Sequence, residues 1–287
     1  MKRTSTPEAG ALQNRLRRIE GRHNALAKEL RGAFARGEPT ADGYSAIEGV
    51  RIIEEAIRSG LKFRAVFFSA SAKHRAERLL PQIAAYTETL LLPDKLFASA
   101  VPSETPQGVA ALVRCKQFTV EEVLRKAKSG PLLAIAGIQD PGNLGTILRS
   151  AEAFGATGVL LGEGTVGAFN AKVVRASAGS VFRLPIVLAK LPEILVLLRE
   201  QGVRLIATSS HKGTPIDQAV LSLPLAVFIG NEGAGLGRDL LAAMDEVVAI
   251  PHSPNVESLN AGVAASIVLY EIARQTSDSP PRRRVTD

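Results

Sequence analysis

The chain has 287 residues, of which 46% are hydrophobic and 22% are charged. This composition is ample for a buried core and is typical of two modest domains. No apolar run approaches the ~18 residues that span a bilayer, and the polar first residues lack the apolar core of a signal peptide. The single cysteine, Cys115, excludes an intrachain disulfide and a cysteine-rich zinc site. We therefore expect a soluble, cytoplasmic protein.

The formal net charge of +7 is concentrated near the amino terminus, because residues 1–40 hold nine Lys or Arg against four Asp or Glu. Apolar residues recur every three or four positions over residues 12–30 and predict an amphipathic helix, whose other face carries Arg15, Arg18 and Arg22. Residues 1–40 are therefore predicted to form a basic helical arm, and residues 276–287 a disordered basic tail. Such an arm suits contact with a nucleic acid, and a merely solvated face is the alternative.

Residues 41–114 have the pattern of a small α/β domain. Helices are predicted at residues 47–60 and 71–80, and strands at residues 63–69, 87–92 and 109–115. Gly60 is a plausible carboxyl-terminal cap of the first helix.

Residues 115–275 have the pattern of a second, larger domain. After a helix at residues 120–130, apolar strands are predicted at residues 132–138, 158–162, 205–210, 225–230 and 246–251. Helical segments separate most of these strands, and a long helix begins near Ser258. Apolar strands that alternate with helices indicate an α/β fold with a mostly parallel sheet covered on both faces.

Three segments of the second domain carry unusual polar residues. Residues 140–149 directly follow a strand and lead into a helix, so Asn143 and Arg149 are expected at the carboxyl edge of the sheet, where open α/β sheets bind ligands. An arginine in this position can reach a phosphate or a developing oxyanion. A surface arginine beside a turn is the alternative.

The second and third segments follow the last two predicted strands. Residues 228–236 place three glycines around Glu232, which allows a ligand to approach the backbone closely. The spacing is not GxGxxG, so a dinucleotide site is disfavoured, and a structural loop is the alternative. In residues 250–265, Ser258 is expected to cap the last helix. Asn260 is a poor helix former, which suggests a role for its side chain.

Together the three segments resemble the SpoU, or TrmH-like, family of RNA ribose 2′-O-methyltransferases. NLGTILRSAEAFGATGVLL resembles the family's first motif, FIGNEGAGL its second and IPHSPNVESLNAGVAASIVLYE its third, in the family's order over about residues 131–273. Residues 20–114, with AIEGVRIIEEAI and ETPQGVAALV, resemble its L30e-like RNA-binding domain. The resemblance implies a SPOUT fold with a deep trefoil knot in residues 115–275, and a homodimer formed through that domain.

The resemblance also implies roles for single residues. The residues that align with catalytic positions of the family are Asn143, Arg149, Glu232, Ser258 and Asn260. Those that align with contacts to S-adenosylmethionine are Gly230, Ile250 and Leu259, and Thr208 and Ile229 are expected as further contacts. Arg175 is expected to contact RNA or the site of the facing subunit, and the basic arm is expected to contact RNA through Arg15, Arg18 and Arg22. His252 departs from the family, where many relatives have methionine, and is expected to alter the rim of the cofactor pocket.

The implied reaction is transfer of a methyl group from S-adenosylmethionine, without a metal, to a ribose 2′-hydroxyl of structured RNA, ribosomal RNA being favoured over transfer RNA. Arg149 is expected to stabilise the developing alkoxide rather than to act as a base, because a guanidinium keeps its proton. Two alternatives stay open: a non-catalytic RNA-binding protein on the same fold, and a base-methylating enzyme on a related knotted fold.

Overall fold

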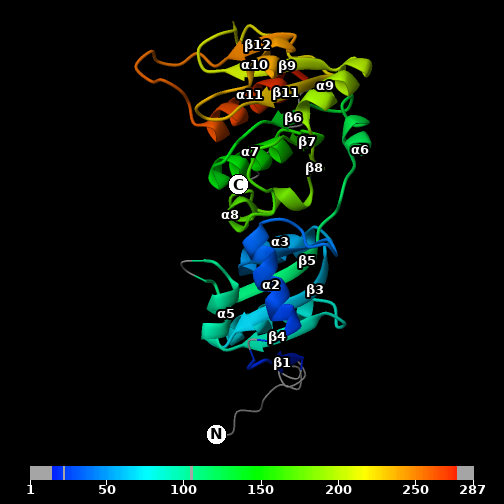
Figure 1. Ribbon diagram of the computed structural model, residues 1–287, viewed down its shortest axis with the longest axis vertical. Helices are drawn as coiled ribbons and strands as arrows, with labels where there is room; N and C mark the ends of the chain where they lie inside the picture. Colours follow the sequence, from blue (N-terminus) through cyan, green and yellow to red (C-terminus); the bar gives the residue numbers. More distant parts are fainter. Residues whose placement is uncertain (1–14, 22, 104–105, 277–287) are drawn as a thin grey trace, which may run out of the picture. The chain divides into compact units, whose positions relative to one another are not determined.

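The computed structural model describes residues 15–21, 23–103 and 106–276 (Figure 1). The chain divides into two compact units. The N-terminal unit consists of residues 1–116 and 167–182, and the C-terminal unit of residues 117–166 and 183–287. Apart from Thr276, the predicted tail lies outside the described residues.

The N-terminal unit is built on a five-stranded mixed sheet in the order β1-β4-β3-β5-β2. Its strands are β1 (Leu16–Arg18), β2 (Tyr44–Glu48), β3 (Lys62–Ser69), β4 (Glu88–Leu92) and β5 (Val109–Arg114). Its helices are α2 (Ala25–Arg36), α3 (Val50–Arg58), α4 (Ala76–Leu79), α5 (Asp94–Ala100) and α8 (Ala171–Ala176). The predicted strands at residues 63–69, 87–92 and 109–115 are confirmed as β3, β4 and β5.

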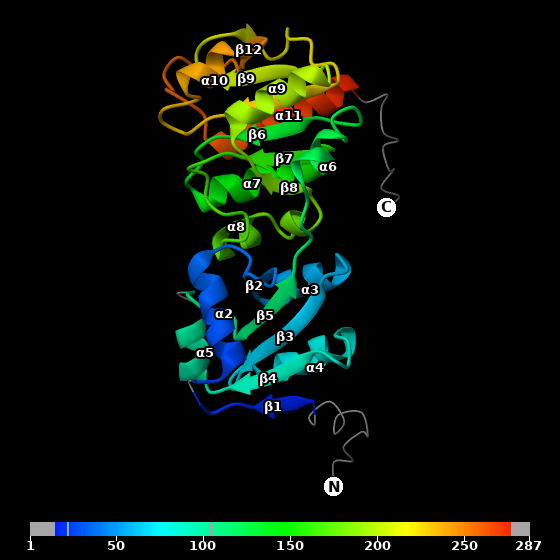
Figure 2. The same cartoon turned by 45° about the vertical axis from the view of Figure 1, so that its right-hand side comes forward.

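Helices cover both faces of this sheet. Figure 2 shows α2 and α5 on one side of it, and α3 and α4 on the other. The apolar residues of α2 and α5 form one core with alternate strand residues such as Phe67 and Leu112, which are fully buried. Burial on both faces explains why β3 and β5 are continuous apolar runs instead of alternating patterns.

The helix predicted over residues 12–30 is wrong at residues 16–18 and is confirmed at residues 25–30, which lie in α2. Residues 16–18 form β1, which pairs in parallel with β4, and α2 begins only at Ala25. Asn24 starts that helix, because its Oδ1 accepts hydrogen bonds from Leu26 N at 3.0 Å and Ala27 N at 3.2 Å. The spacing of apolar residues fits a short strand followed by a helix as well as it fits one long helix. This part of the chain therefore belongs to the sheet and core of the N-terminal unit.

The C-terminal unit contains a seven-stranded sheet in the order β10-β12-β9-β11-β6-β7-β8, in which every pair is parallel. Its strands are β6 (Leu132–Ile135), β7 (Gly158–Leu161), β8 (Ile186–Leu188), β9 (Arg204–Ser209), β10 (Thr214–Pro215), β11 (Leu225–Ile229) and β12 (Glu246–Ala249). Its helices are α6 (Val120–Leu124), α7 (Pro141–Ala153), α9 (Leu191–Glu200), α10 (Arg238–Ala242) and α11 (Ala261–Thr276). The predicted strands of this domain are confirmed, and the short edge strands β8 and β10 are additional.

The helices of this unit form two groups. Helices α6, α9 and α10 share one apolar core with alternate residues of the central strands. The other two, α7 and α11, pack against each other, and the hydroxyls of Ser150 and Ser266 lie 2.6 Å apart. A Cβ at Gly262 would lie 3.0 Å from Thr146 Cβ, so the absence of a side chain at Gly262 allows the two helices to pack closely. The fold is thus α/β, with a parallel sheet covered by helices.

The segment at residues 167–182, which the sequence places in the second domain, groups with the N-terminal unit. Within that unit, Arg175 on α8 donates a hydrogen bond from Nη1 to Oε2 of Glu48, 3.1 Å away at the end of β2. Glu48 is buried, so this pairing offsets the cost of removing its charge from water. Among the described residues, no helix has both the length and the apolar character needed to cross a membrane.

Candidate active site

The candidate site lies where four neighbouring strands of the C-terminal unit end. Because β12, β9, β11 and β6 are adjacent and parallel, their carboxyl ends lie at one edge of the sheet. The segments that follow these strands contain the three motifs singled out in the sequence. The topology of the sheet therefore brings together segments that are about 120 residues apart in the chain.

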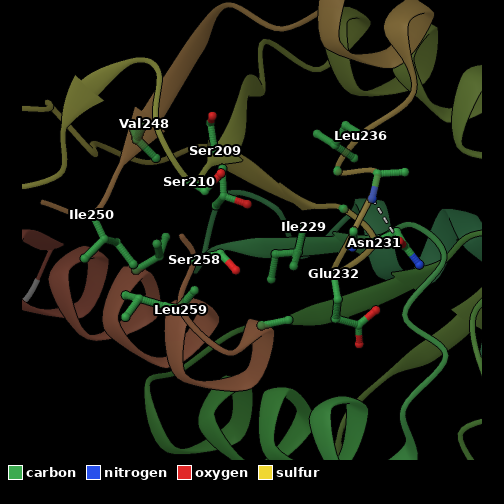
Figure 3. Close-up of a pocket in the computed structure, with 18 of the residues that line it drawn as sticks. Ser209, Ser210, Ile229, Asn231, Glu232, Leu236, Val248, Ile250, Ser258 and Leu259 are labelled. Atoms are coloured by element: carbon green, nitrogen blue, oxygen red, sulfur yellow. Dashed lines mark hydrogen bonds between the residues drawn. The ribbon is translucent and has the colours of Figure 1, made fainter. Parts of the chain in front are cut away.

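A cavity of about 310 Å³ opens at this edge. It is lined by all five residues predicted to contact the cofactor, Thr208, Ile229, Gly230, Ile250 and Leu259, and by two predicted catalytic residues, Glu232 and Ser258. Figure 3 shows Val248 and Ile250 on one side of the cavity and Leu236 on the other, with Ile229, Ser258 and Leu259 between them. The sequence did not single out Ser209, the last residue of β9, and Ser210, the next one, which also line the cavity.

The glycine-rich loop after β11 folds back tightly on itself. Gly230 leaves no room for a side chain, because a Cβ there would overlap the Gly235 carbonyl carbon and Leu236 N. Asn231 holds the turn, since its Oδ1 accepts hydrogen bonds from Gly233 N at 2.9 Å and Ala234 N at 3.1 Å. Sequence reasoning missed this residue, although the tendency of asparagine to bond with the backbone two residues ahead is a usable signal.

Three of the five predicted catalytic residues form a chain of hydrogen bonds. Asn260 donates from Nδ2 to Asn143 Oδ1 at 2.7 Å, and Asn143 donates from Nδ2 to Glu232 Oε1 at 2.9 Å. Among the described residues, none donates a hydrogen bond to Glu232 Oε2. These two hydrogen bonds form the Asn260–Asn143–Glu232 relay. The relay holds the carboxylate of Glu232 at the cavity and leaves its Oε2 open to a ligand.

Local capping places the members of this relay. Asp140 caps α7, because its Oδ1 accepts from Asn143 N at 2.7 Å, and Pro141 occupies the first helical position. The predicted cap of the last helix is wrong: α11 begins at Ala261, and Asn260 Oδ1, rather than Ser258, accepts from Val263 N at 3.2 Å. Asn260 is favoured over Ser258 as the cap of α11, because its amide can accept a hydrogen bond from the helix and also donate one to Asn143.

Arg149 is on α7, outside the cavity lining. It follows Asn143 by six residues, which in a helix corresponds to about 9 Å along the axis and about 240° of rotation. Its side chain is exposed and forms no hydrogen bond or ion pair with any described residue. Within one copy of the chain, Arg149 and the relay therefore lie on different faces of α7.

The arginines predicted to bind RNA are in different environments. Arg15 donates to the carbonyls of residues 80, 83 and 84 at 2.8, 3.1 and 2.9 Å, and thereby anchors β1 to the N-terminal unit. Arg18 is exposed and has no partner among the described residues. Arg22 lies outside the described residues. Arg175 pairs with Glu48 and keeps 37% of its side chain exposed.

The residues that line the cavity fit S-adenosylmethionine. Apolar side chains of Ile229, Leu236 and Leu259 offer surfaces for an adenine ring, and hydroxyls of Ser209 and Ser258 lie at the same cavity. Mostly apolar walls with a few polar groups are typical of small-molecule sites, as is a volume of several hundred Å³. Among the described residues, no group of three or more His, Cys, Asp or Glu is arranged to hold a metal ion.

Comparison with known proteins assigns both parts of the chain. The profile of the SpoU rRNA Methylase family matches residues 131–270, and that of the MRM3-like substrate binding domain matches residues 24–111. Two crystal structures with bound AdoMet are similar. An rRNA methyltransferase from Sinorhizobium meliloti aligns with a TM-score of 0.77 and 26% identity over 91% of this chain and 98% of its own. The SpoU methyltransferase AviRb from Streptomyces viridochromogenes aligns with a TM-score of 0.75 and 27% identity over 88% and 98%.

A similar sequence is the 23S rRNA (guanosine(2553)-2′-O)-methyltransferase RlmP of Bacillus subtilis. It is 33% identical over 257 residues, which cover 90% of this chain and 99% of the relative. The match therefore includes both units and extends beyond the three motifs. The chain belongs to the SpoU family of RNA methyltransferases.

Proposed function

We propose that this enzyme methylates a ribose 2′-hydroxyl of 23S ribosomal RNA, in the cytoplasm, with S-adenosylmethionine as the methyl donor. The observation that carries the proposal is the position of the relay beside a cavity lined by every predicted cofactor contact. Similarity to RlmP over both units supports ribosomal RNA as the substrate.

The bound donor supplies an electrophilic sulfonium methyl group, which the ribose oxygen takes as the carbon–sulfur bond breaks. Glu232 Oε2 is open to accept a hydrogen bond from the hydroxyl, and Asn143 holds the other oxygen of that carboxylate. Holding the reacting groups in line is worth roughly 7–11 kcal/mol in favourable cases. Because Arg149 and the relay lie on different faces of α7 within one copy, the Arg149 that stabilises the developing alkoxide is proposed to come from the other subunit of the homodimer. The proton leaves to a phosphate or to water.

The test uses labelled S-adenosylmethionine, 23S rRNA and the purified enzyme, with the product digested to nucleosides. Wild type should place the label in a 2′-O-methylated nucleoside with an alkali-resistant linkage, and Asn143→Ala and Arg149→Ala should lose this product. Arg238→Ala is the matched control, because this exposed arginine at the start of α10 lies outside the cavity lining.

Each alternative predicts a different result. Label in a base would establish the base-methylating enzyme. RNA binding without label in any RNA would establish a non-catalytic binding protein. Arg149→Lys with full activity and a shifted pH optimum would show that this residue titrates as a base. Mapping the labelled nucleotide by primer extension on 23S rRNA then identifies the target.

The proposal includes a homodimer formed through the C-terminal unit, and the trefoil knot stays a prediction of the family resemblance. Val263 and Tyr270 on α11 are 47% and 54% exposed and stand seven residues apart, so they share one helix face. Large apolar side chains grouped on a surface are typical of interfaces. Tyr270→Glu should convert the dimer to a monomer in light scattering, whereas Val196→Glu, at an exposed position on α9, should not. A dimer that persists with Tyr270→Glu would exclude this face.

A further inference from the structure

His252 lies in the segment between β12 and α11 and has no role in the function proposed above. Its half-buried ring lines the cofactor cavity and also a second, more open cavity of about 710 Å³ that runs beside it. Ser210 and Ile250 line both cavities as well, so these residues form a shared wall. A side chain in such a wall can contact a ligand in either cavity.

The hydrogen bond within this segment determines the tautomer of the ring. His252 Nδ1 lies 2.8 Å from the carbonyl oxygen of Ile250. Because a carbonyl oxygen only accepts hydrogen bonds, Nδ1 must carry the proton and donate it. In the neutral imidazole, Nε2 then has a free lone pair and is an acceptor. The same bond also restricts rotation of the ring, so the direction of that lone pair is set by the backbone.

The acceptor atom is accessible and unused within the described chain. Nε2 of His252 forms no hydrogen bond with a described residue, and it is absent from the buried side-chain atoms that lack a partner, which are Glu29 Oε1 and Ser45 Oγ. An accessible acceptor without a protein partner is available to a ligand. The neighbouring ring of His211, with its centroid 6.0 Å away, lines only the second cavity.

The other side-chain acceptors in the lining of the cofactor cavity are the carboxylate of Glu232, the amide oxygen of Asn231 and the hydroxyls of Thr208, Ser209, Ser210 and Ser258. Glu232 Oε1 is engaged in the relay and its Oε2 is assigned above to the ribose hydroxyl, while the Thr208 hydroxyl donates to Phe228 O at 3.2 Å. S-adenosylmethionine carries several donors: an adenine amino group, two ribose hydroxyls and an ammonium group. We propose that His252 Nε2 accepts a hydrogen bond from one of these N–H or O–H groups and so contributes to cofactor affinity. This inference rests on the function proposed above.

The test uses two variants of His252, each of which keeps a polar group near one of the two ring nitrogens. Asn at position 252 keeps a donor near the position of Nδ1 and loses the acceptor, whereas Gln can place its amide oxygen near the position of Nε2. A neutral hydrogen bond contributes about 1 kcal/mol, so His252→Asn should raise the Kd for S-adenosylmethionine about fivefold, and His252→Gln should stay near wild type. The matched control is His211→Asn, which should leave the Kd unchanged. Calorimetric titration measures all four proteins.

The outcomes separate this inference from the proposed function. If His252→Asn binds as tightly as wild type, His252 does not contact the cofactor. If both His252 variants weaken binding equally and also lower Tm, the residue is structural and the inference fails. If wild type does not bind S-adenosylmethionine, the proposed function itself fails. When the expected pattern is found, titration with 5′-methylthioadenosine, which lacks the amino-acid end, shows whether the donor lies on the adenosine or is the ammonium group.

Discussion

The residues of the candidate site are oriented by one another through amide groups. Asn260 uses its oxygen to accept from Val263 N, which directs its amide nitrogen toward Asn143. The oxygen of Asn143 is thereby engaged, and its nitrogen faces Glu232. Because each amide has a distinct donor end and acceptor end, reversing one would break two hydrogen bonds. The orientation of Glu232 is therefore determined by the cap of a helix that begins almost thirty residues later in the chain.

The relay predicts an order among variants of Asn143. Asn143→Ala removes the support for Glu232 and should lower kcat roughly a hundredfold, the usual cost of a misplaced reacting group. Asn143→Asp should be worse, because a second carboxylate within hydrogen-bond distance of Glu232 repels it. Single-turnover methylation at saturating RNA measures both. Equal rates in the two variants would show that Asn143 does not position Glu232.

Cys115 should be inert in the folded protein. Burial raises the pKa of its thiol from 9.0 to about 12, and the neighbouring Ser45 hydroxyl opposes this shift only in part. The thiolate fraction at pH 8 is therefore roughly a thousandfold lower than in the unfolded chain. Native protein should react far more slowly with a disulfide reagent than protein in urea. Comparable rates in the two states would mean that the thiol is accessible.

The same shift gives a direction for stability. The folded pKa lies above the unfolded one, so the stabilising contribution is complete below pH 9 and decreases as the pH rises toward 12. Relative to Cys115→Ala, wild type should lose free energy of unfolding over that interval. A constant difference between the two proteins above pH 9 would contradict the raised pKa.

At the residue scale, the sequence predicted which polar residues lie near one another better than it predicted the hydrogen bonds between them. Asn143, Glu232 and Asn260 could be selected because polar residues after apolar strands of a parallel sheet converge at one edge. Their mutual hydrogen bonds could not be read, since these depend on distances between segments remote in the chain. The environment of Arg15 was equally invisible, because it bonds with carbonyls of residues 80–84 that no local pattern connects with it.

At the scale of elements, the loop after β11 illustrates how backbone shape forms a site. Gly230 continues the strand while the chain folds back onto it, and Asn231 pairs with Gly235 as an isolated bridge. Figure 3 shows Asn231 bonded within this turn beside Leu236. The absence of a side chain at Gly230 lets the two parts of the loop touch, and the loop in turn lines the cofactor cavity.

Two glycines of this loop should respond differently to alanine. Gly230→Ala would push a methyl group into backbone atoms of Gly235 and Leu236, which cannot rotate away, and should cost about 1–3 kcal/mol as well as most cofactor binding. Gly233→Ala meets nothing closer than Asn231 Oδ1 at 3.7 Å and should change Tm little. Differential scanning fluorimetry compares the two. A neutral Gly230→Ala would mean that the loop opens in solution.

Elements were predictable where they were long or fully buried. The apolar runs that became β6, β9 and β11 are continuous because both faces of a parallel sheet are covered. Short elements such as β1 and β10 could not be predicted, since two or three paired residues carry no periodic signal. The strand β2 was also missed, because its last residues fell inside the helix predicted for residues 47–60.

At the scale of the whole molecule, the residues predicted to bind the cofactor and those of the predicted basic arm belong to different units. Every residue that lines the cofactor cavity belongs to the C-terminal unit, while Arg15 and Arg18 belong to the N-terminal unit. The chain passes between the units three times, because residues 167–182 leave the C-terminal unit and add α8 to the other. The periodicity of the sequence does not show this crossing, because residues 167–182 lie between the methyltransferase motifs in the sequence but pack with the N-terminal unit. Its position follows from tertiary contacts such as the pair between Glu48 and Arg175.

Substitutions of two arginines in the N-terminal unit should affect different properties, RNA binding for Arg18 and thermal stability for Arg15. Arg18 is exposed without a partner in the described chain, so Arg18→Gln should weaken RNA binding, reduce the slope of log Kd against log salt by about 1, and leave Tm unchanged. Arg15→Gln removes hydrogen bonds to three carbonyls and should lower Tm by several degrees. Neither change should alter the Kd for S-adenosylmethionine. Filter binding over a salt series and calorimetry measure these quantities. If the salt slope of Arg18→Gln equals that of wild type, Arg18 does not contact RNA, and the residues that bind the substrate lie elsewhere in the chain.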